Sequence, residues 1–164
     1  MGEVLQSFLS GAGLTKYDLA SEAAYADIRA LRMSDIESFA GNTGLSVADA
    51  TTLKKHLFVG RHEYPLDGAT IARQRFTATH EIAHAWKAAA EGELTLGQKA
   101  WIRQLADHEL AERSFMARGI PYLRQESWNG SSFGTVPPGA HNLAPKPPNT
   151  TFPGYRMPSS FWSN

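Results

Sequence analysis

Cysteine is missing from the sequence, and so is any excess of charge of one sign. Without cysteine the chain cannot form disulfide bridges or thiolate metal sites, which excludes zinc deaminases of the His/Cys/Cys type. The 16 Lys and Arg residues balance the 16 Asp and Glu residues, so the overall charge gives no general attraction to polyanions. A local basic cleft is compatible with this balance. No apolar run approaches the roughly 18 residues of a membrane-spanning helix, and we therefore expect no membrane association.

A single, mainly α-helical domain is predicted from the length and from helix-start signals. The chain has 164 residues, of which 42% are hydrophobic, as in globular proteins. Residues 15–40 are predicted to form one or two helices, the second beginning with a capping box at Ser34, and Ser46 is predicted to cap a further helix. Two more helices are expected, one from about 79 to 91 and one that begins with a capping box at Thr95.

The remaining segments lack helical periodicity. Residues 59–76 contain a Pro, Asp and Gly turn between short extended pieces, which predicts a small β-hairpin. Residues 129–164 are rich in Pro, Asn and Ser, and we expect an extended tail there that packs on the body through its aromatic residues. The catalytic domain is therefore expected over 1–128, with N-terminal helices in 1–45 and the core with the site in 46–128.

The stretch HEIAH has the HExxH spacing of zinc metallopeptidases. His80 and His84 are one helical turn apart and could bind one zinc ion, while Glu81 could deprotonate a zinc-bound water. A peptidase would need a third ligand from another element. Glu109 or Glu112 on the next helix could supply it, so a zinc metallopeptidase is one alternative function.

Helical phase argues against that alternative. At about 100° per residue, His80 and His84 share a face with Lys87, whereas the large apolar residues Ile82 and Trp86 lie on the opposite side. A zinc peptidase needs the histidine pair to point inward, to the floor of a cleft. The phase predicts instead that the two histidines face solvent.

A second motif, HELAE, lies on the following helix with the opposite orientation. His108, Glu109 and Glu112 fall within the apolar arc of that helix. Burial of a carboxylate costs several kcal/mol unless the carboxylate is paired. Two interpretations follow: an acid–base or metal-binding cluster that lines a cleft, or a buried structural network with cations. The candidate cations for such a network are Lys55, Arg73 and Arg75.

The sequence also resembles a group of bacterial polymorphic-toxin C-terminal domains. The resemblance rests on LKKHLF, a later His, RQRF, IAHAW and LADHELAE, covers roughly residues 40–125, and extends to GAHNLAP at 139–145. It implies an enzymatic domain that is secreted or delivered, acts in the cytoplasm of a target cell and is bound by a cognate immunity protein. Nucleic acid is the commonest target class of such domains. The motif positions in this chain are His56, His62, Arg75, Phe76, Ile82, Trp86, His108, Glu109 and Glu112.

Our leading hypothesis is a toxin hydrolase that attacks nucleic acid in the manner of a ribonuclease. Two histidines would act as general acid and base near neutral pH, and a glutamate would orient one of them or act as base. Arg75 with Lys55 would bind the substrate and stabilise the phosphate charge. The candidates for the proton-transfer steps are His56, His62, His108, Glu109 and Glu112.

A metal-dependent variant and a non-enzymatic alternative stay open. In the variant, His108 and Glu112 bind a divalent ion together with His56 or His62, and Glu109 activates water. HELAE then works as an HExxH whose last ligand is Glu. If the buried polar cluster is only structural, the protein is instead a helical binding module without catalytic activity.

Overall fold

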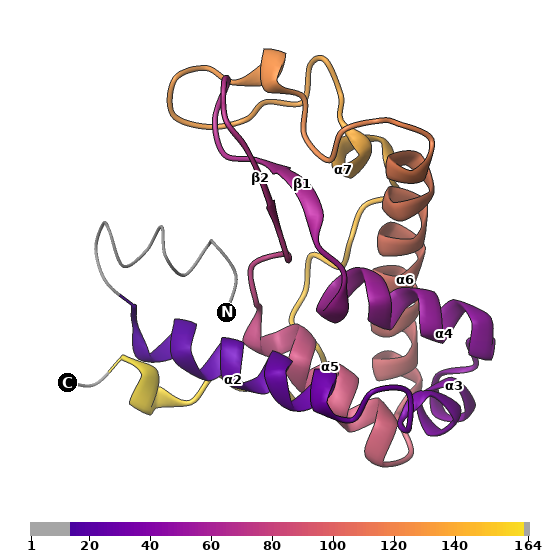
Figure 1. Cartoon of the computed structure of the whole chain (residues 1–164). Helices are drawn as coiled ribbons and strands as arrows, with labels where there is room; N and C mark the ends of the chain where they lie inside the picture. Colours follow the sequence, from indigo (N-terminus) through magenta and orange to yellow (C-terminus); the bar gives the residue numbers. More distant parts are fainter. Residues whose placement is uncertain (1–13, 163–164) are drawn as a thin grey trace.

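The computed structural model describes residues 14–162 and is mainly helical with one small hairpin, as predicted (Figure 1). Residues 1–13, part of the expected N-terminal helices, and 163–164, the end of the expected tail, lie outside the described residues. The helices are α2 (Lys16–Ala30), α3 (Ile36–Thr43), α4 (Val47–Lys54), the single π-helical turn η1 (Lys55–Val59), α5 (His80–Glu91), α6 (Leu96–Ala117), the 3-10 helix η2 (Gln125–Ser127), α7 (Ala140–Leu143) and the 3-10 helix η3 (Ser159–Phe161). The strands are β1 (His62–Pro65) and β2 (Ile71–Gln74).

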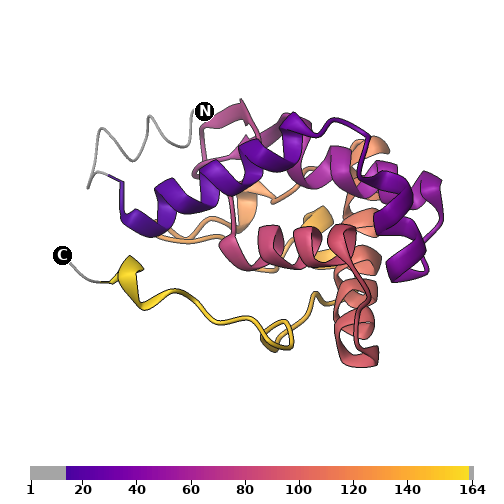
Figure 2. The same ribbon diagram turned by 90° about the horizontal axis from the view of Figure 1, so that it is seen from below.

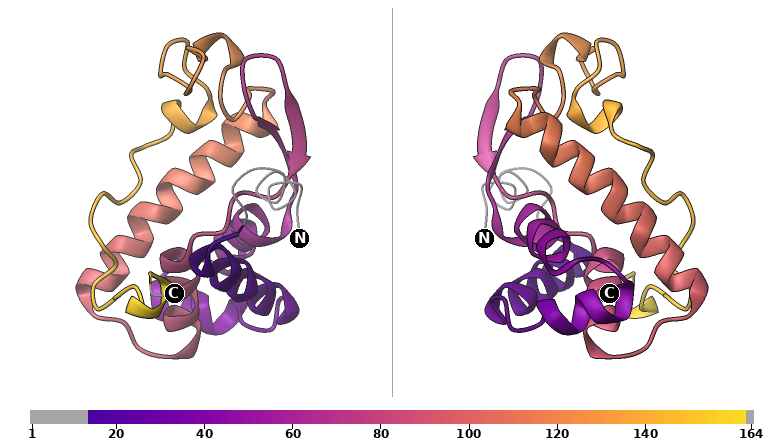
Figure 3. Two further views of the ribbon diagram at one scale, coloured as in Figure 1. Left: turned by 90° about the vertical axis from the view of Figure 1, so that its left-hand side faces the viewer. Right: turned by 90° about the vertical axis from the view of Figure 1, so that its right-hand side faces the viewer.

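The long helix α6 contacts both the helical bundle, through α3, α4 and η1, and the C-terminal helix α7. Figure 3 shows it crossing the molecule, with the bundle of α2 to α5 beside its N-terminal half and the hairpin and α7 near its C-terminal end. In Figure 2, α2 and α5 lie side by side, and the segment after α7 runs along α5. The core contains Phe39, which stacks on Trp86 at a centroid distance of 3.7 Å, and Phe58 against the same indole. None of the helices between residues 14 and 162 is long and apolar enough to cross a membrane.

Side-chain caps explain where α2, α4 and α6 begin. The capping box of Thr95 is present, and Ser46 accepts a hydrogen bond from the Asp49 amide, so both predicted caps are confirmed. The capping box predicted at Ser34 is wrong. The residue before α3 is Asp35, whose carboxylate does not cap the helix because it is occupied by two buried side chains from α4 and α5.

The predicted hairpin forms directly after the π-helical turn. The strands pair antiparallel, with His62 opposite Gln74. Their turn is fixed by Asp67, whose carboxylate accepts hydrogen bonds from the amides of Ala69 and Thr70 at 2.8 and 2.7 Å. The hairpin projects beyond the helical bundle, as Figure 1 shows. On its first strand, His62 lines a hollow together with Met116 of α6, and the Tyr64 ring packs near that of Tyr122, just after α6.

The prediction of an extended C-terminal tail is not supported. Residues 129–162 include α7 and η3, and the amide of Ala140 donates to the Pro121 carbonyl at 2.8 Å. Gly139 allows this close approach, because a Cβ atom there would lie 2.6 Å from the Tyr122 carbonyl oxygen. The segment after residue 128 is therefore fixed against the loop that follows α6, and Phe152 from the same segment is fully buried.

A buried ion pair joins three helices of the bundle. Lys54 on α4 is inaccessible to solvent and donates to the Asp35 carboxylate at 2.5 Å and to the Arg32 carbonyl. The indole N–H of Trp86 on α5 donates to the other Asp35 oxygen at 2.8 Å. Each polar group of this network has a partner, which is the condition for a buried charge to be tolerated.

We predict that Asp35→Ala destabilises the fold by about 3–5 kcal/mol, because it leaves the buried Lys54 charge without a counter-ion. Asp27→Ala is the control, since its pair with Lys87 is at the surface, at 3.4 Å, and should contribute less than about 1 kcal/mol. Urea denaturation of both variants measures the difference. Equal losses of unfolding free energy would contradict the importance of the buried pair.

Candidate functional site

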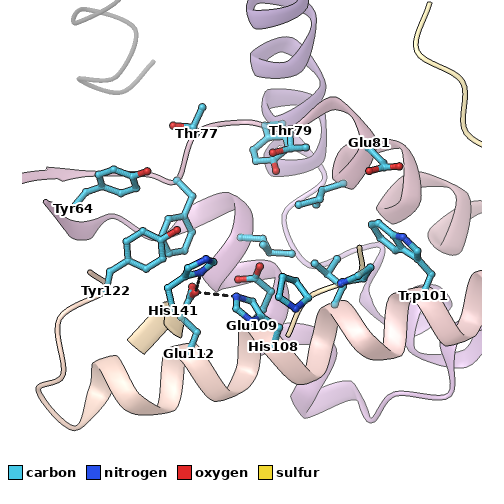
Figure 4. A pocket seen from close by; sticks show the side chains of 17 residues that line it. Tyr64, Thr77, Thr79, Glu81, Trp101, His108, Glu109, Glu112, Tyr122 and His141 are labelled. Atoms are coloured by element: carbon cyan, nitrogen blue, oxygen red, sulfur yellow. Dashed lines mark hydrogen bonds and ion pairs between the residues drawn. The ribbon is translucent and has the colours of Figure 1, made fainter. Parts of the chain in front are cut away.

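The carboxylate of Glu112 is the centre of a buried His/Glu cluster. Its Oε1 lies 2.9 Å from Nε2 of His56. Its Oε2 lies 3.1 Å from Nε2 of His108 and 2.9 Å from Nδ1 of His141 (Figure 4). Only 2% of the Glu112 side chain is exposed. Glu109 is the second carboxylate of the cluster, with Oε2 at 3.3 Å from Nε2 of His56.

Three separate elements bring these side chains together. His108 and Glu112 are four residues apart on α6 and therefore lie on one face of that helix. His56 belongs to η1, whose wider turn is closed by the Gly60 amide on the Lys55 carbonyl at 2.7 Å. Single π-helical turns of this kind occur frequently at functional sites. His141 is on α7, the short helix that begins after Gly139.

The second ring nitrogens distinguish His108 from His56. Nδ1 of His108 lies 2.6 Å from the Pro145 carbonyl, which can only accept, so Nδ1 carries a proton. Its Nε2 then faces a carboxylate oxygen, and this contact requires either a second proton or a cation. His56 differs, because its Nδ1 is buried without a hydrogen-bond partner and its Nε2–H is available to donate to both glutamates.

Burial and pairing have opposite effects on the pKa values in the cluster. Burial alone raises the pKa of Glu112, but hydrogen bonds to His108, His141 and His56 outweigh burial and hold this pKa well below its usual range. Burial alone lowers the pKa of His56 and that of His108. Hydrogen bonds to the glutamates outweigh it, together with the Pro145 carbonyl at His108, so both histidine pKa values are raised. The cluster is therefore arranged to keep Glu112 ionised.

A pocket of about 330 Å³ opens beside the cluster. Glu109, Glu112, His108 and His141 lie on its wall, and Figure 4 shows Thr77, Thr79 and Glu81 across from them. No Lys or Arg is among the described residues that line it. The pocket also carries aromatic rings, from Tyr25, Tyr64, Phe76, Trp101 and Tyr122.

The cations predicted to bind phosphate are not brought to this pocket. Lys55 is exposed, and Arg75 donates from Nε to the Val59 carbonyl at 3.2 Å. Neither of them lines the pocket. The alternative network of buried glutamates with Lys55, Arg73 or Arg75 is absent from the ion pairs of the described residues, in which the partners of Glu109 and Glu112 are histidines.

His62 packs against His56 but is not part of the cluster around Glu112. Its Nε2–H donates to the His56 carbonyl at 3.0 Å, and its ring stacks on Phe76 at a centroid distance of 4.2 Å. Burial lowers the pKa of His62, which favours the neutral ring. His62 therefore contacts the backbone of His56 and not the carboxylate of Glu112.

The histidines of HEIAH do not reach the cluster. His84 is exposed, and Nδ1 of His80 lies 2.8 Å from the Tyr155 hydroxyl. Glu81 accepts a hydrogen bond from the Phe152 amide at 2.9 Å. Trp86 on the same helix is buried, as the helical phase predicts. HEIAH thus contacts the C-terminal segment.

Two groups of side chains could hold a metal ion. Within residues 14–162 these are His108, Glu112 and His141, and His56, Glu109 and Glu112, with ligand atoms that lie within 4.8 Å of one another. Neither group contains His80 or His84. His141 is absent from the candidates derived from the sequence, although it lies in GAHNLAP, the stretch to which the toxin resemblance extends. Its isolated position near prolines gave no helical signal.

Comparisons with known proteins leave the function to be argued from this site. No family model, curated protein or solved structure matches the chain. The resemblance to toxin domains thus rests on its motifs alone, and the geometry around Glu112 is the stronger basis for a functional proposal.

We predict that Glu112→Ala destabilises the protein by about 3 kcal/mol, because the buried imidazoles of His56 and His108 lose their acceptor. Glu109→Ala is the matched control on the same helix, because it has one histidine partner at a longer distance and is more exposed. We expect it to cost less than about 1.5 kcal/mol. Chemical denaturation of metal-free protein measures both values. A neutral Glu112→Ala would show that the cluster does not stabilise the fold.

Proposed function

We propose that this protein is a hydrolase that uses a divalent metal ion, held by His108, Glu112 and His141, to cleave phosphodiester bonds of nucleic acid. The observation that carries the proposal is the convergence of two imidazole nitrogens on one carboxylate oxygen at the wall of a pocket. We further propose, from the motif resemblance, that it acts as a toxin domain delivered to the cytoplasm of a target cell and is neutralised by an immunity protein.

The donor set fits a catalytic metal. Histidines that bind metal usually donate their other ring N–H to a carbonyl or carboxylate, and His108 does so to Pro145. A set of two imidazole nitrogens and one carboxylate would provide three protein ligands, as in catalytic zinc sites. Zinc is therefore the first choice, and other divalent first-row ions accept the same ligands. The group around His56 fits less well, because its Nδ1 has no partner to orient the ring.

The chain's own residues provide the proton transfer. Glu109 follows His108, lines the pocket and lies outside the proposed ligand set, so it is placed to act as general base. His56 donates to both glutamates and orients them. A bound divalent ion supplies Lewis acidity to a substrate oxygen. In the hydrolysis, water oxygen bonds to phosphorus and the ester P–O bond breaks. Glu109 takes a proton from water as the water oxygen bonds to phosphorus, and the protonated Glu109 then gives this proton to the leaving oxygen.

The charge of the pocket supports metal dependence. A phosphodiester is anionic, and the described pocket wall offers carboxylates but no Lys or Arg. Positive charge must then come from a bound ion and from the imidazoles. This replaces the predicted roles of Arg75 and Lys55, while His108, Glu109 and Glu112 keep functional roles. Support for nucleic acid as substrate comes from the aromatic rings of the pocket and from the motif resemblance.

We predict that His141→Ala lowers zinc affinity and metal-dependent cleavage of RNA or DNA by more than about a hundredfold, since it removes a direct ligand. His84→Ala is the control, because this exposed histidine is four residues from His80 but outside the cluster. Calorimetric zinc titration and gel assays on RNA, DNA and casein provide the measurements.

Cleavage of casein by the wild-type protein, together with loss of zinc binding in His84→Ala, would favour a peptidase that uses HEIAH. Absence of both zinc binding and hydrolysis in the wild type would instead favour a binding module.

A further inference from the structure

The pocket has apolar rings at both ends and the His/Glu cluster between them. Figure 4 shows Tyr64 and Tyr122 on one side, Trp101 on the other, and the cluster in the middle. We call the first group (Tyr64, Phe76 and Tyr122) the tyrosine end. The second group (Trp101, Pro147 and Pro148) is the tryptophan end. All six residues line the same pocket.

The tyrosine end is a compact set of half-buried rings. The Tyr122 ring lies 5.3 Å from that of Tyr64, 5.0 Å from that of Phe76 and 5.4 Å from that of His141, measured between centroids. These rings come from β1, the segment after β2 and the loop after α6. Their mutual contacts hold them next to the proposed metal ligand His141.

The tryptophan end is also fixed, but Trp101 is buried there, with 6% of the residue exposed, whereas Pro147 and Pro148 are half-buried. The indole N–H of Trp101 donates to the Thr150 carbonyl at 2.8 Å, which sets the orientation of the ring. Gln104, three residues further along α6, donates to the carbonyls of Lys146 and Pro147 at 3.2 Å. The two prolines are therefore held beside the helix, on the side of His108 away from the tyrosine end.

Apolar rings on both sides of a hydrolytic centre, aromatic at the tyrosine end and mainly proline at the tryptophan end, fit a substrate with flat groups on both sides of the scissile bond. Nucleobases stack on aromatic side chains whatever their sequence, and paired bases in a duplex are not available for this contact. We propose that the pocket binds single-stranded nucleic acid, with one base at the tyrosine end and the base across the scissile phosphodiester at the tryptophan end. This inference rests on the proposed function and names the form of its substrate.

The test uses a dinucleoside monophosphate, which contains two bases and one phosphodiester. Its binding to the zinc-loaded Glu109→Gln protein is measured by calorimetry, so that cleavage does not interfere. Analogues that lack either base should bind about ten- to a hundredfold more weakly, the effect of losing one stacked base. Equal affinity for the intact compound and both analogues would overturn the proposal.

Tyr64→Leu tests the assignment of one end. It should weaken the intact dinucleotide about tenfold and leave the affinity of one of the two abasic analogues unchanged, because that analogue has no base at the tyrosine end. Tyr17→Leu is the control, since Tyr17 is an aromatic residue outside the pocket. Thermal unfolding verifies that both variants are folded. If Tyr64→Leu weakens all three compounds equally, the base is not at this end.

If only the proposed hydrolase function is wrong, the result differs. The dinucleotide then binds with the expected dependence on both bases, but wild-type zinc-loaded protein hydrolyses no oligonucleotide. If oligonucleotides are hydrolysed and duplexes are cut as fast as single strands, hydrolase function stands and the single-strand inference is wrong.

Discussion

The buried carboxylate of Glu112 is the constraint on which the site depends. An ionised carboxylate inside a protein is stable only with partners, and here they are three imidazoles from η1, α6 and α7. Meeting this requirement brings a π-helical turn, a long helix and a segment far along the chain to one point. The same convergence produces the geometry in which a metal ion could be held.

A second buried charge explains why the helical bundle supports the site. Lys54 ends α4 immediately before η1, and its pair with Asp35 fixes that end of the helix against α3 and α5. His56 is two residues further on and is fully buried. The ion pair thus limits the movement of the turn that carries His56, and rigid support of this kind is what a preorganised site needs.

The chemistry of the pocket follows from what its wall contains and what it lacks. Carboxylates and imidazoles meet without a Lys or Arg from the described part of the chain, so anionic substrates require another source of positive charge. His108, oriented by Pro145, is suited to hold a cation, whereas His56 is suited to donate to glutamates. The two histidines therefore have different roles, because Nδ1 of His108 has the Pro145 carbonyl as partner and Nδ1 of His56 has none.

The sequence by itself determined the helical class, most caps and the faces of the two motif helices. Periodicity placed Glu112 and His108 inside and His84 outside, because the phase of a helix depends only on spacing along the chain. Only the tertiary structure decided which distant segments meet that face. His141 became the third partner, and Arg75 turned to a backbone carbonyl instead of the pocket. Contacts between distant segments depend on packing between elements and on close approaches such as that of Gly139 to the Tyr122 carbonyl. Local sequence patterns do not encode them.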